Sequence, residues 1–169
     1  EKRLCTGLGG PAARVWQREV DATMNLFSML NQRAENGDPV RVGMIGAGKF
    51  GTMFLSQVRR LAGIHLIGVA DLSPANARSN MAFAGWEPER FAATSLDQAA
   101  KDGGTHVGDD WQALVAHPAV DIVIECTGAP VAAIDHILGA FDNGKHVINV
   151  TVEALSLIHI SEPTRQAEI

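Results

Sequence analysis

The sequence predicts an α/β fold in which helices cover both faces of a parallel sheet. Short apolar segments alternate with amphipathic segments from residue 40 onward. A glycine-rich turn joins the first apolar segment to the amphipathic segment that follows it, and Asp71 closes the second apolar segment. Strands buried on both faces are continuously apolar, and strands that alternate with helices form parallel sheets with right-handed crossovers.

The order of elements follows from the apolar spacing and from the residues that end each segment. A first helix is expected after Met24, with Leu26, Phe27, Leu30 and Ala34 on one face and Asn36-Gly37 at its end. Expected strands span 40–45, 64–71, 105–110, 121–128 and 145–150, and expected helices follow at 50–63, 74–84, 95–104, 110–117 and 130–143. In the helix that follows the first strand, the expected buried residues are Phe50, Met53, Phe54, Val58 and Leu61.

The first strand runs into Gly46-Ala47-Gly48-Lys49-Phe50-Gly51, which has the spacing of a dinucleotide-binding turn. Gly46 allows the tight turn, Gly48 lets the backbone approach a pyrophosphate, and Gly51 allows close helix–strand packing. Lys49 and Phe50 complete the candidate loop, whose helix N terminus faces the phosphates. Asp71, twenty positions after Gly51 (71 − 51 = 20), is suited to bind the adenosine ribose. We therefore expect a Rossmann-type, doubly wound sheet.

The cofactor is expected to be NAD or NADP, and Asp71 favours NAD because a carboxylate repels a 2′-phosphate. Arg78 is either a solvated helix residue or a cation that could pair with that phosphate.

Residues that end the fourth strand form a second candidate region. Thr127-Gly128 is expected to let the nicotinamide half of the cofactor pass close to the backbone, although a plain strand-to-helix turn is the alternative. Glu125 either points toward the cofactor or is a solvated carboxylate at the strand end. Cys126 is expected to be a small core residue without chemistry of its own.

Several functions are disfavoured by composition. The net charge of −5 provides no basic surface for nucleic acid, and no apolar run is long enough for a membrane span. The two cysteines are too few for a disulfide framework, which favours the cytoplasm. No histidine has metal-ligand spacing, so no metal site is expected, and Asp109-Asp110 is interpreted as a helix cap. Trp86 and Trp111 are expected to be packing residues.

The segments "VRVGMIGAGKFGTMFLSQ", "GVADLSPANAR", "DIVIECTG" and "GKHVINVTVEA" resemble the NAD(P)-binding domain of homoserine-dehydrogenase-like oxidoreductases. The resemblance is closest to the subgroup with a C-terminal SAF domain, which includes deoxyxylulose-phosphate-reductoisomerase-like enzymes. It implies hydride transfer to or from a small-molecule substrate in the intact protein, and it is compatible with a homo-oligomer. It also implies that the catalytic residues, which the sequence leaves unknown, belong to a domain beyond this fragment, so the fragment alone is expected to be inactive.

One departure from the family pattern supports a second hypothesis. The related loops supply a lysine after the strand that begins "GKHV", whereas no lysine follows Lys145 here. A non-catalytic, dinucleotide-sensing module is therefore the alternative function. Glu153, just past the last strand, is either an active-site residue or a plain loop carboxylate.

The chain ends carry separate interpretations. Residues 1–23 lack a sustained periodicity and are interpreted as translated upstream DNA, and residues 24–39 as a helix and linker. The dinucleotide-binding domain is expected at 40–154. Residues 155–169, "LSLIHISEPTRQAEI", resemble a translated transposase sequencing adapter, so they are expected to pack poorly or to form a spurious strand.

Overall fold

The computed structural model describes residues 25–155, so the interpretations of residues 1–23 and of nearly all of 155–169 lie outside the described part. Five parallel strands form one sheet in the order β3-β2-β1-β4-β5. The strands are β1 (Val40–Ile45), β2 (Ile64–Ala70), β3 (His106–Gly108), β4 (Ile122–Glu125) and β5 (His146–Asn149). The predicted doubly wound sheet is confirmed, and the strand order reverses at β1, between β2 and β4.

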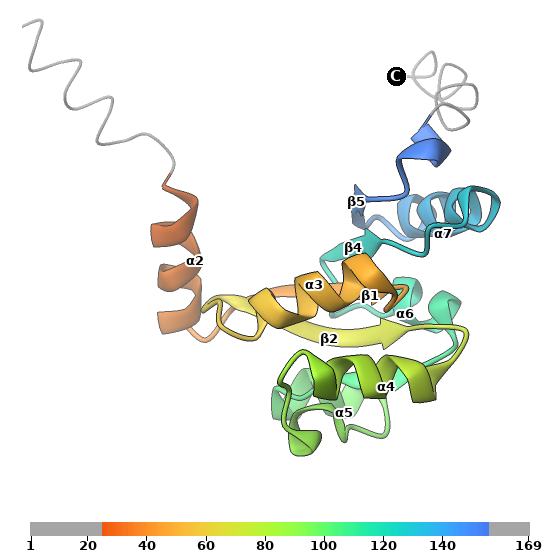
Figure 1. The fold of residues 1–169 in the computed structure, drawn as a ribbon. Coiled ribbons are helices and arrows are strands. Elements are labelled where there is room, and N and C mark those ends of the chain that lie inside the picture. The colour runs from red at the N-terminus through yellow and green to blue at the C-terminus, as the bar shows by residue number, and fades with distance from the viewer. Residues whose placement is uncertain (1–24, 156–169) are drawn as a thin grey trace, which may run out of the picture.

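Helices connect the strands and cover both faces of the sheet (Figure 1). They are α2 (Leu26–Glu35), α3 (Lys49–Val58), α4 (Pro74–Phe83), α5 (Leu96–Asp102), α6 (Trp111–Ala116) and α7 (Pro130–Asp142), with 3-10 turns η1 (Pro88–Phe91) and η2 (Val152–Ala154). Helices α3 and α4 pack on one face, where Leu55 and Met81 meet Met44. Helices α5, α6 and α7 pack on the other face, where Leu114 meets Ile67.

Glycine in the strands allows this second layer to lie close to the sheet. A Cβ on Gly43 would lie 3.1 Å from Cδ1 of Leu114, and a Cβ on Gly68 would lie 2.6 Å from the same atom. The side chain of Leu114 therefore occupies the space that a larger residue at either position would need. Helix α6 therefore packs on the middle of the sheet, and its N terminus lies at the carboxyl edge of the strands, beside the end of β2.

The buried face predicted for α3 was wrong in part. Its buried residues are Gly51, Leu55 and Val58, whereas Phe50 and Met53 are exposed. The helix also ends at Val58, before Leu61. Of the predicted residues, Val58 is buried and Phe54 is partly buried against the core, so the spacing of large side chains identified only part of the buried face.

Helix α2 forms as predicted but contributes nothing to the described core. None of its residues is buried, and Leu26 and Phe27 are 67% and 65% exposed. It approaches the rest of the domain closely at Gly63, where a Cβ would collide with the carbonyl oxygen of Leu30. Figure 1 shows this helix standing away from the sheet.

Candidate functional site

The glycine-rich turn lies between the end of β1 and the start of α3. Gly46 has a φ of 94°, and a Cβ on it would lie 2.8 Å from the backbone of Thr127. A Cβ on Gly51 would lie 2.7 Å from the carbonyl oxygen of Gly46. Both positions therefore require glycine, because a side chain would collide with backbone.

Gly48 has a different role in this turn. Its φ of −71° is ordinary for any residue, and a Cβ placed on it would meet nothing within 4 Å. Gly48 lines an open pocket and is the N-cap of α3, which has no side-chain cap. The first N–H groups of a helix lack intrahelical partners and carry partial positive charge, so this uncapped N terminus suits a phosphate group.

Asp71 follows β2 and ties two loops together. Its Oδ2 accepts a hydrogen bond from the Ala47 N–H at 2.7 Å, and its Oδ1 accepts one from the Ser73 N–H at 2.8 Å. The carboxylate is thereby fixed beside the glycine turn, with lone pairs left on each oxygen for a further donor. Ser73 is the N-cap of α4, and its hydroxyl makes no capping hydrogen bond.

A pocket of about 450 Å³ joins these features at the carboxyl edge of the sheet. Of the predicted residues, Gly46, Gly48, Asp71 and Thr127 line it. Lys49 lies over a neighbouring groove between α3 and α4, and Phe50 is exposed on α3. The pocket is also lined by Ile45, Ala70, Leu72, Asp109, Trp111, Ala129, Ala132, Asp135 and His136.

The buried carboxylate of Glu125 organises one side of this pocket. Its position contradicts both interpretations from the sequence, a carboxylate that points toward the cofactor and a solvated carboxylate. Glu125 is neither solvated nor a pocket-lining residue, because its side chain is fully buried behind Thr127. Its Oε1 accepts hydrogen bonds from the N–H and the hydroxyl of Thr127 and lies 3.5 Å from Nδ1 of His136. The Gly128 N–H donates to the Thr151 hydroxyl at 3.1 Å. The turns after β4 and β5 are thus held together.

The ionisation of Glu125 follows from these donors. Burial alone would raise its pKa, but hydrogen bonds from His136, Thr127 and Thr151 outweigh burial and lower the pKa below its ordinary value. Glu125 is therefore a carboxylate at neutral pH. One signal of this role is visible in the sequence: Glu125 is a single acidic residue at the end of an otherwise apolar strand.

Cys126 is buried, as predicted, and its thiol donates to the carbonyl of Gly46 at 3.0 Å. Burial and the nearby charges of Glu125 and Asp71 raise its pKa to about 12. The thiolate is the reactive form, so alkylation in a Cys5→Ser variant at pH 8 should be at least about 10³-fold slower than for an exposed thiol. Timing iodoacetamide labelling by mass spectrometry checks this, and labelling at the rate of free cysteine would contradict it.

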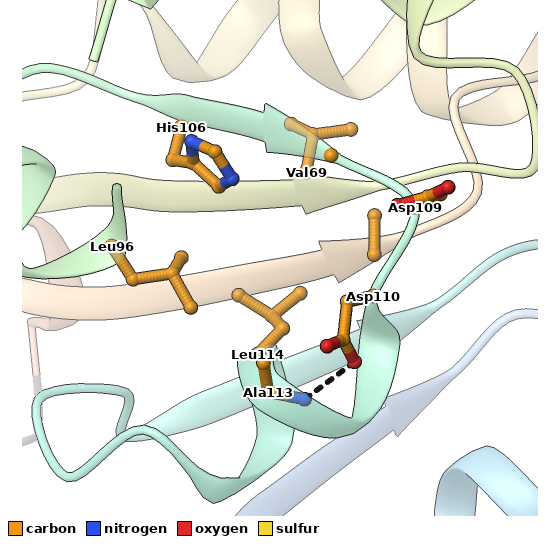
Figure 2. Close-up of a pocket in the computed structure, with 9 residues that line it drawn as sticks. Val69, Leu96, His106, Asp109, Asp110, Ala113 and Leu114 are labelled. Atoms are coloured by element: carbon orange, nitrogen blue, oxygen red, sulfur yellow. Dashed lines mark hydrogen bonds between the residues drawn. The ribbon is translucent and has the colours of Figure 1, made fainter. Parts of the chain in front are cut away.

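The remaining polar residues that the sequence singled out have structural partners. Within residues 25–155, no three His, Cys, Asp or Glu side chains form a group that could hold a metal ion. Figure 2 shows Asp110 beside a cavity of about 80 Å³, where its Oδ1 accepts the Ala113 N–H at 2.9 Å. Asp110 is therefore the N-cap of α6, as expected. His65 and His106 are satisfied by backbone carbonyls.

Trp86 and His136 are both buried, but they have different surroundings. Trp86 is a packing residue, and its Nε1 donates to the carbonyl of Leu55. His136, by contrast, is buried and lines the pocket, with its ring edge-on to Trp111 at a centroid distance of 4.7 Å. Arg78 is an exposed residue of α4, as one of its two readings expected, and its guanidinium donates to the carbonyl of Val107 at 2.8 Å.

The parallel sheet, the glycine turn at its reversal point and the acidic residue after β2 together define a dinucleotide-binding domain. The chain belongs to the family described as "Homoserine dehydrogenase, NAD binding domain", whose model matches residues 46–162. This family is the NAD-binding part of oxidoreductases, which confirms the predicted domain function.

Two curated relatives show how much of such a protein this chain spans. Homoserine dehydrogenase of Methylobacillus glycogenes is 31% identical over 119 residues, covering 65% of this chain and 24% of the relative. A 4-carboxy-2-hydroxymuconate-6-semialdehyde dehydrogenase of Sphingobium sp. is 27% identical over 108 residues, covering 64% and 28%. The chain therefore spans about a quarter of the length of these relatives.

The fold has a counterpart among solved structures. An NAD binding oxidoreductase from Klebsiella pneumoniae superimposes with a TM-score of 0.53 at 22% identity, covering 78% of this chain and 33% of the other. Among the described helices, none has the length and apolar character that crossing a membrane requires.

Proposed function

We propose that this chain supplies the cofactor site of an NAD(P)-dependent oxidoreductase that acts on a small-molecule substrate. The observation that carries the proposal is the open space in front of Gly48, bordered by the uncapped N terminus of α3 and by Asp71. A nicotinamide cofactor supplies hydride transfer when bound. The substrate-binding residues are proposed to belong to the larger part of the relatives' length that this chain does not span.

Each candidate residue has a proposed contact with the cofactor. Gly46, Gly48 and Gly51 would shape the pyrophosphate site, with Lys49 and Phe50 contributing the N–H groups of the first helical turn. Asp71 would accept hydrogen bonds from the adenosine ribose. Thr127 and Gly128 would border the nicotinamide side, where the Glu125 and Thr151 hydrogen bonds hold them in place.

NAD is the proposed preference over NADP. The Asp71 carboxylate is fixed at the pocket, and Asp109 lines the same pocket, so a 2′-phosphate would meet negative charge. The nearest predicted cation, Arg78, is already bonded to the carbonyl of Val107.

An Asp71→Asn substitution should lower the NAD preference. The asparagine retains a side-chain oxygen for one of the two loop N–H groups but removes the charge that repels a 2′-phosphate. We expect the ratio of NAD⁺ to NADP⁺ affinity to fall by about tenfold or more. Calorimetric titration of both cofactors into both proteins measures the ratio, and an unchanged ratio would refute the assignment of Asp71.

Hydride transfer is favoured over the alternative of a non-catalytic sensor by the relatives, which are named as dehydrogenases. The missing loop lysine remains the observation behind the sensor hypothesis. Lys145 does not replace it, because its Nζ donates to the carbonyl of His117, at the amino end of the sheet. An assay of the longest gene product containing this domain distinguishes the two, since a sensor would bind NAD(H) without turnover.

Two finer proposals concern the chain as a whole. We propose membership of the subgroup with a C-terminal SAF domain, and an origin of residues 155–169 in adapter DNA, because the residue pattern matches an adapter translation over consecutive positions. The family match reaches into this segment as far as residue 162. Resequencing the source gene tests both proposals, and genomic DNA that encodes these same residues would overturn the second.

A further inference from the structure

The peptide group between Ala47 and Gly48 is held by a side chain from outside the cofactor pocket. Nδ2 of Asn80 donates a hydrogen bond to the carbonyl oxygen of Ala47 at 2.7 Å. Asn80 belongs to α4, and it lines the groove between α3 and α4, whereas the cofactor pocket lies on the other side of the glycine turn. The contact therefore reaches the turn from the side away from the pocket.

The geometry of this peptide group decides where the Gly48 N–H points. The peptide is trans, so its C=O and its N–H point in opposite directions. Because the carbonyl is directed at Asn80 in the groove, the N–H is directed to the other side of the turn, where Gly48 lines the cofactor pocket. Within residues 25–155 the Gly48 N–H has no hydrogen-bond partner. It is thus a free donor aimed into the pocket.

Both backbone groups of Ala47 are fixed by side chains that are distant in sequence. Oδ2 of Asp71 accepts the Ala47 N–H at 2.7 Å, and Asn80 binds the carbonyl. Asn80 is itself held in place, because its neighbours Ala77 and Met81 on α4 are completely buried in the core. The turn is therefore preorganised, and a phosphate can bind to it without first ordering the loop.

We propose that Asn80 is a positioning residue for the cofactor pyrophosphate, because it orients the Gly48 N–H toward a phosphate oxygen. This inference rests on the proposed function of the pocket as an NAD(P) site. The N–H groups of Lys49 and Phe50 are oriented by α3 itself, whereas Gly48 is the N-cap and its N–H depends on the turn. A hydrogen bond from an N–H to a charged oxygen is about twice as strong as one between neutral groups. Asn80 acts only through the carbonyl of Ala47, since it does not line the pocket.

Asn80→Leu tests the proposal, because leucine has a similar volume but removes the donor without adding charge. Calorimetric titration of NAD⁺ into the full chain should show an affinity at least about tenfold weaker than that of the wild type. Asn143→Leu is the matched control. Nδ2 of Asn143 donates to the carbonyl of Gly139 at 2.8 Å at the exposed end of α7, so this variant loses the same kind of bond outside the pocket. We expect its affinity to stay within about twofold of the wild type. An equal affinity in the wild type and in folded Asn80→Leu would overturn the proposal.

Nuclear magnetic resonance of the isotopically labelled wild type supplies a readout that a merely structural role of Asn80 would not move. The amide proton of Gly48 should shift downfield when NAD⁺ binds, because a hydrogen bond to a phosphate oxygen deshields that proton. In Asn80→Leu saturated with NAD⁺, the shift should be smaller. A Gly48 resonance that does not move in wild-type protein that binds NAD⁺ would overturn the proposal and leave the cofactor site intact. Failure of the folded wild type to bind NAD⁺ at all would instead reject the proposed function, and this inference with it.

Discussion

Replacing Glu125 with alanine should lower the free energy of unfolding by about 3 kcal/mol, one of the two largest effects expected in this domain. The substitution leaves the Thr127 N–H, the Thr127 hydroxyl and the His136 Nδ1–H without their acceptor in a buried site. It also opens a cavity at a fully buried position, which adds to the cost. Denaturant unfolding followed by circular dichroism measures the loss.

A matched control is Glu89→Ala in η1, where the carboxylate is exposed. We expect its effect to stay within about 0.5 kcal/mol. If Glu125→Ala and Glu89→Ala had equal effects, Glu125 would not be the centre of the network described above.

The contribution of Glu125 should also depend on pH. Its folded-state pKa is lowered, so the stabilisation is fully present above its ordinary value of 4.5 and is lost as the pH falls toward the lowered pKa. The stability difference between the wild type and Glu125→Gln should therefore shrink between neutral pH and pH values below 4.5. A difference that grew on acidification would show that the folded-state pKa of Glu125 is raised rather than lowered.

Gly48→Asp is expected to abolish cofactor binding without damaging the fold. The backbone at Gly48 is compatible with a side chain, and aspartate is a favourable N-cap for α3, so the stability should be unchanged or slightly higher. The new carboxylate would occupy the pocket and repel a pyrophosphate at the helix N terminus. We expect the NAD⁺ affinity to fall by at least about 100-fold, or about 2.7 kcal/mol.

Gly48→Asn separates the two causes, because asparagine caps a helix as aspartate does but carries no charge. It should weaken binding through volume alone, and less than Gly48→Asp. NAD⁺ affinity within twofold of the wild type in Gly48→Asp would show that the cofactor does not approach α3 at this turn.

Local patterns predicted the sheet, its order of elements and the glycine turn. Each depends on residues near one another in the chain, such as the apolar run from Val40 to Ile45 and the turn from Gly46 to Gly51. Asp110 was recognisable as a cap because it directly precedes an amphipathic segment, and in the structure it accepts the N–H of Ala113, three residues later. Predicting these features from the sequence requires no knowledge of which residues pack against them.

The errors concern partners that are distant in sequence. The buried face of α3 depends on which side meets the sheet, and the spacing of large side chains identified only part of it. Glu125 contacts His136 only because β4 and α7 fold back on each other. The spacing of apolar residues along the chain therefore could not predict that Glu125 is buried.

Calorimetric titration of NAD⁺ into the full 169-residue chain tests the central claim most directly. We expect saturable binding at one site per chain, which Gly48→Asp removes. Absence of binding to wild-type protein that circular dichroism shows to be folded would contradict the assignment of this pocket as a dinucleotide site.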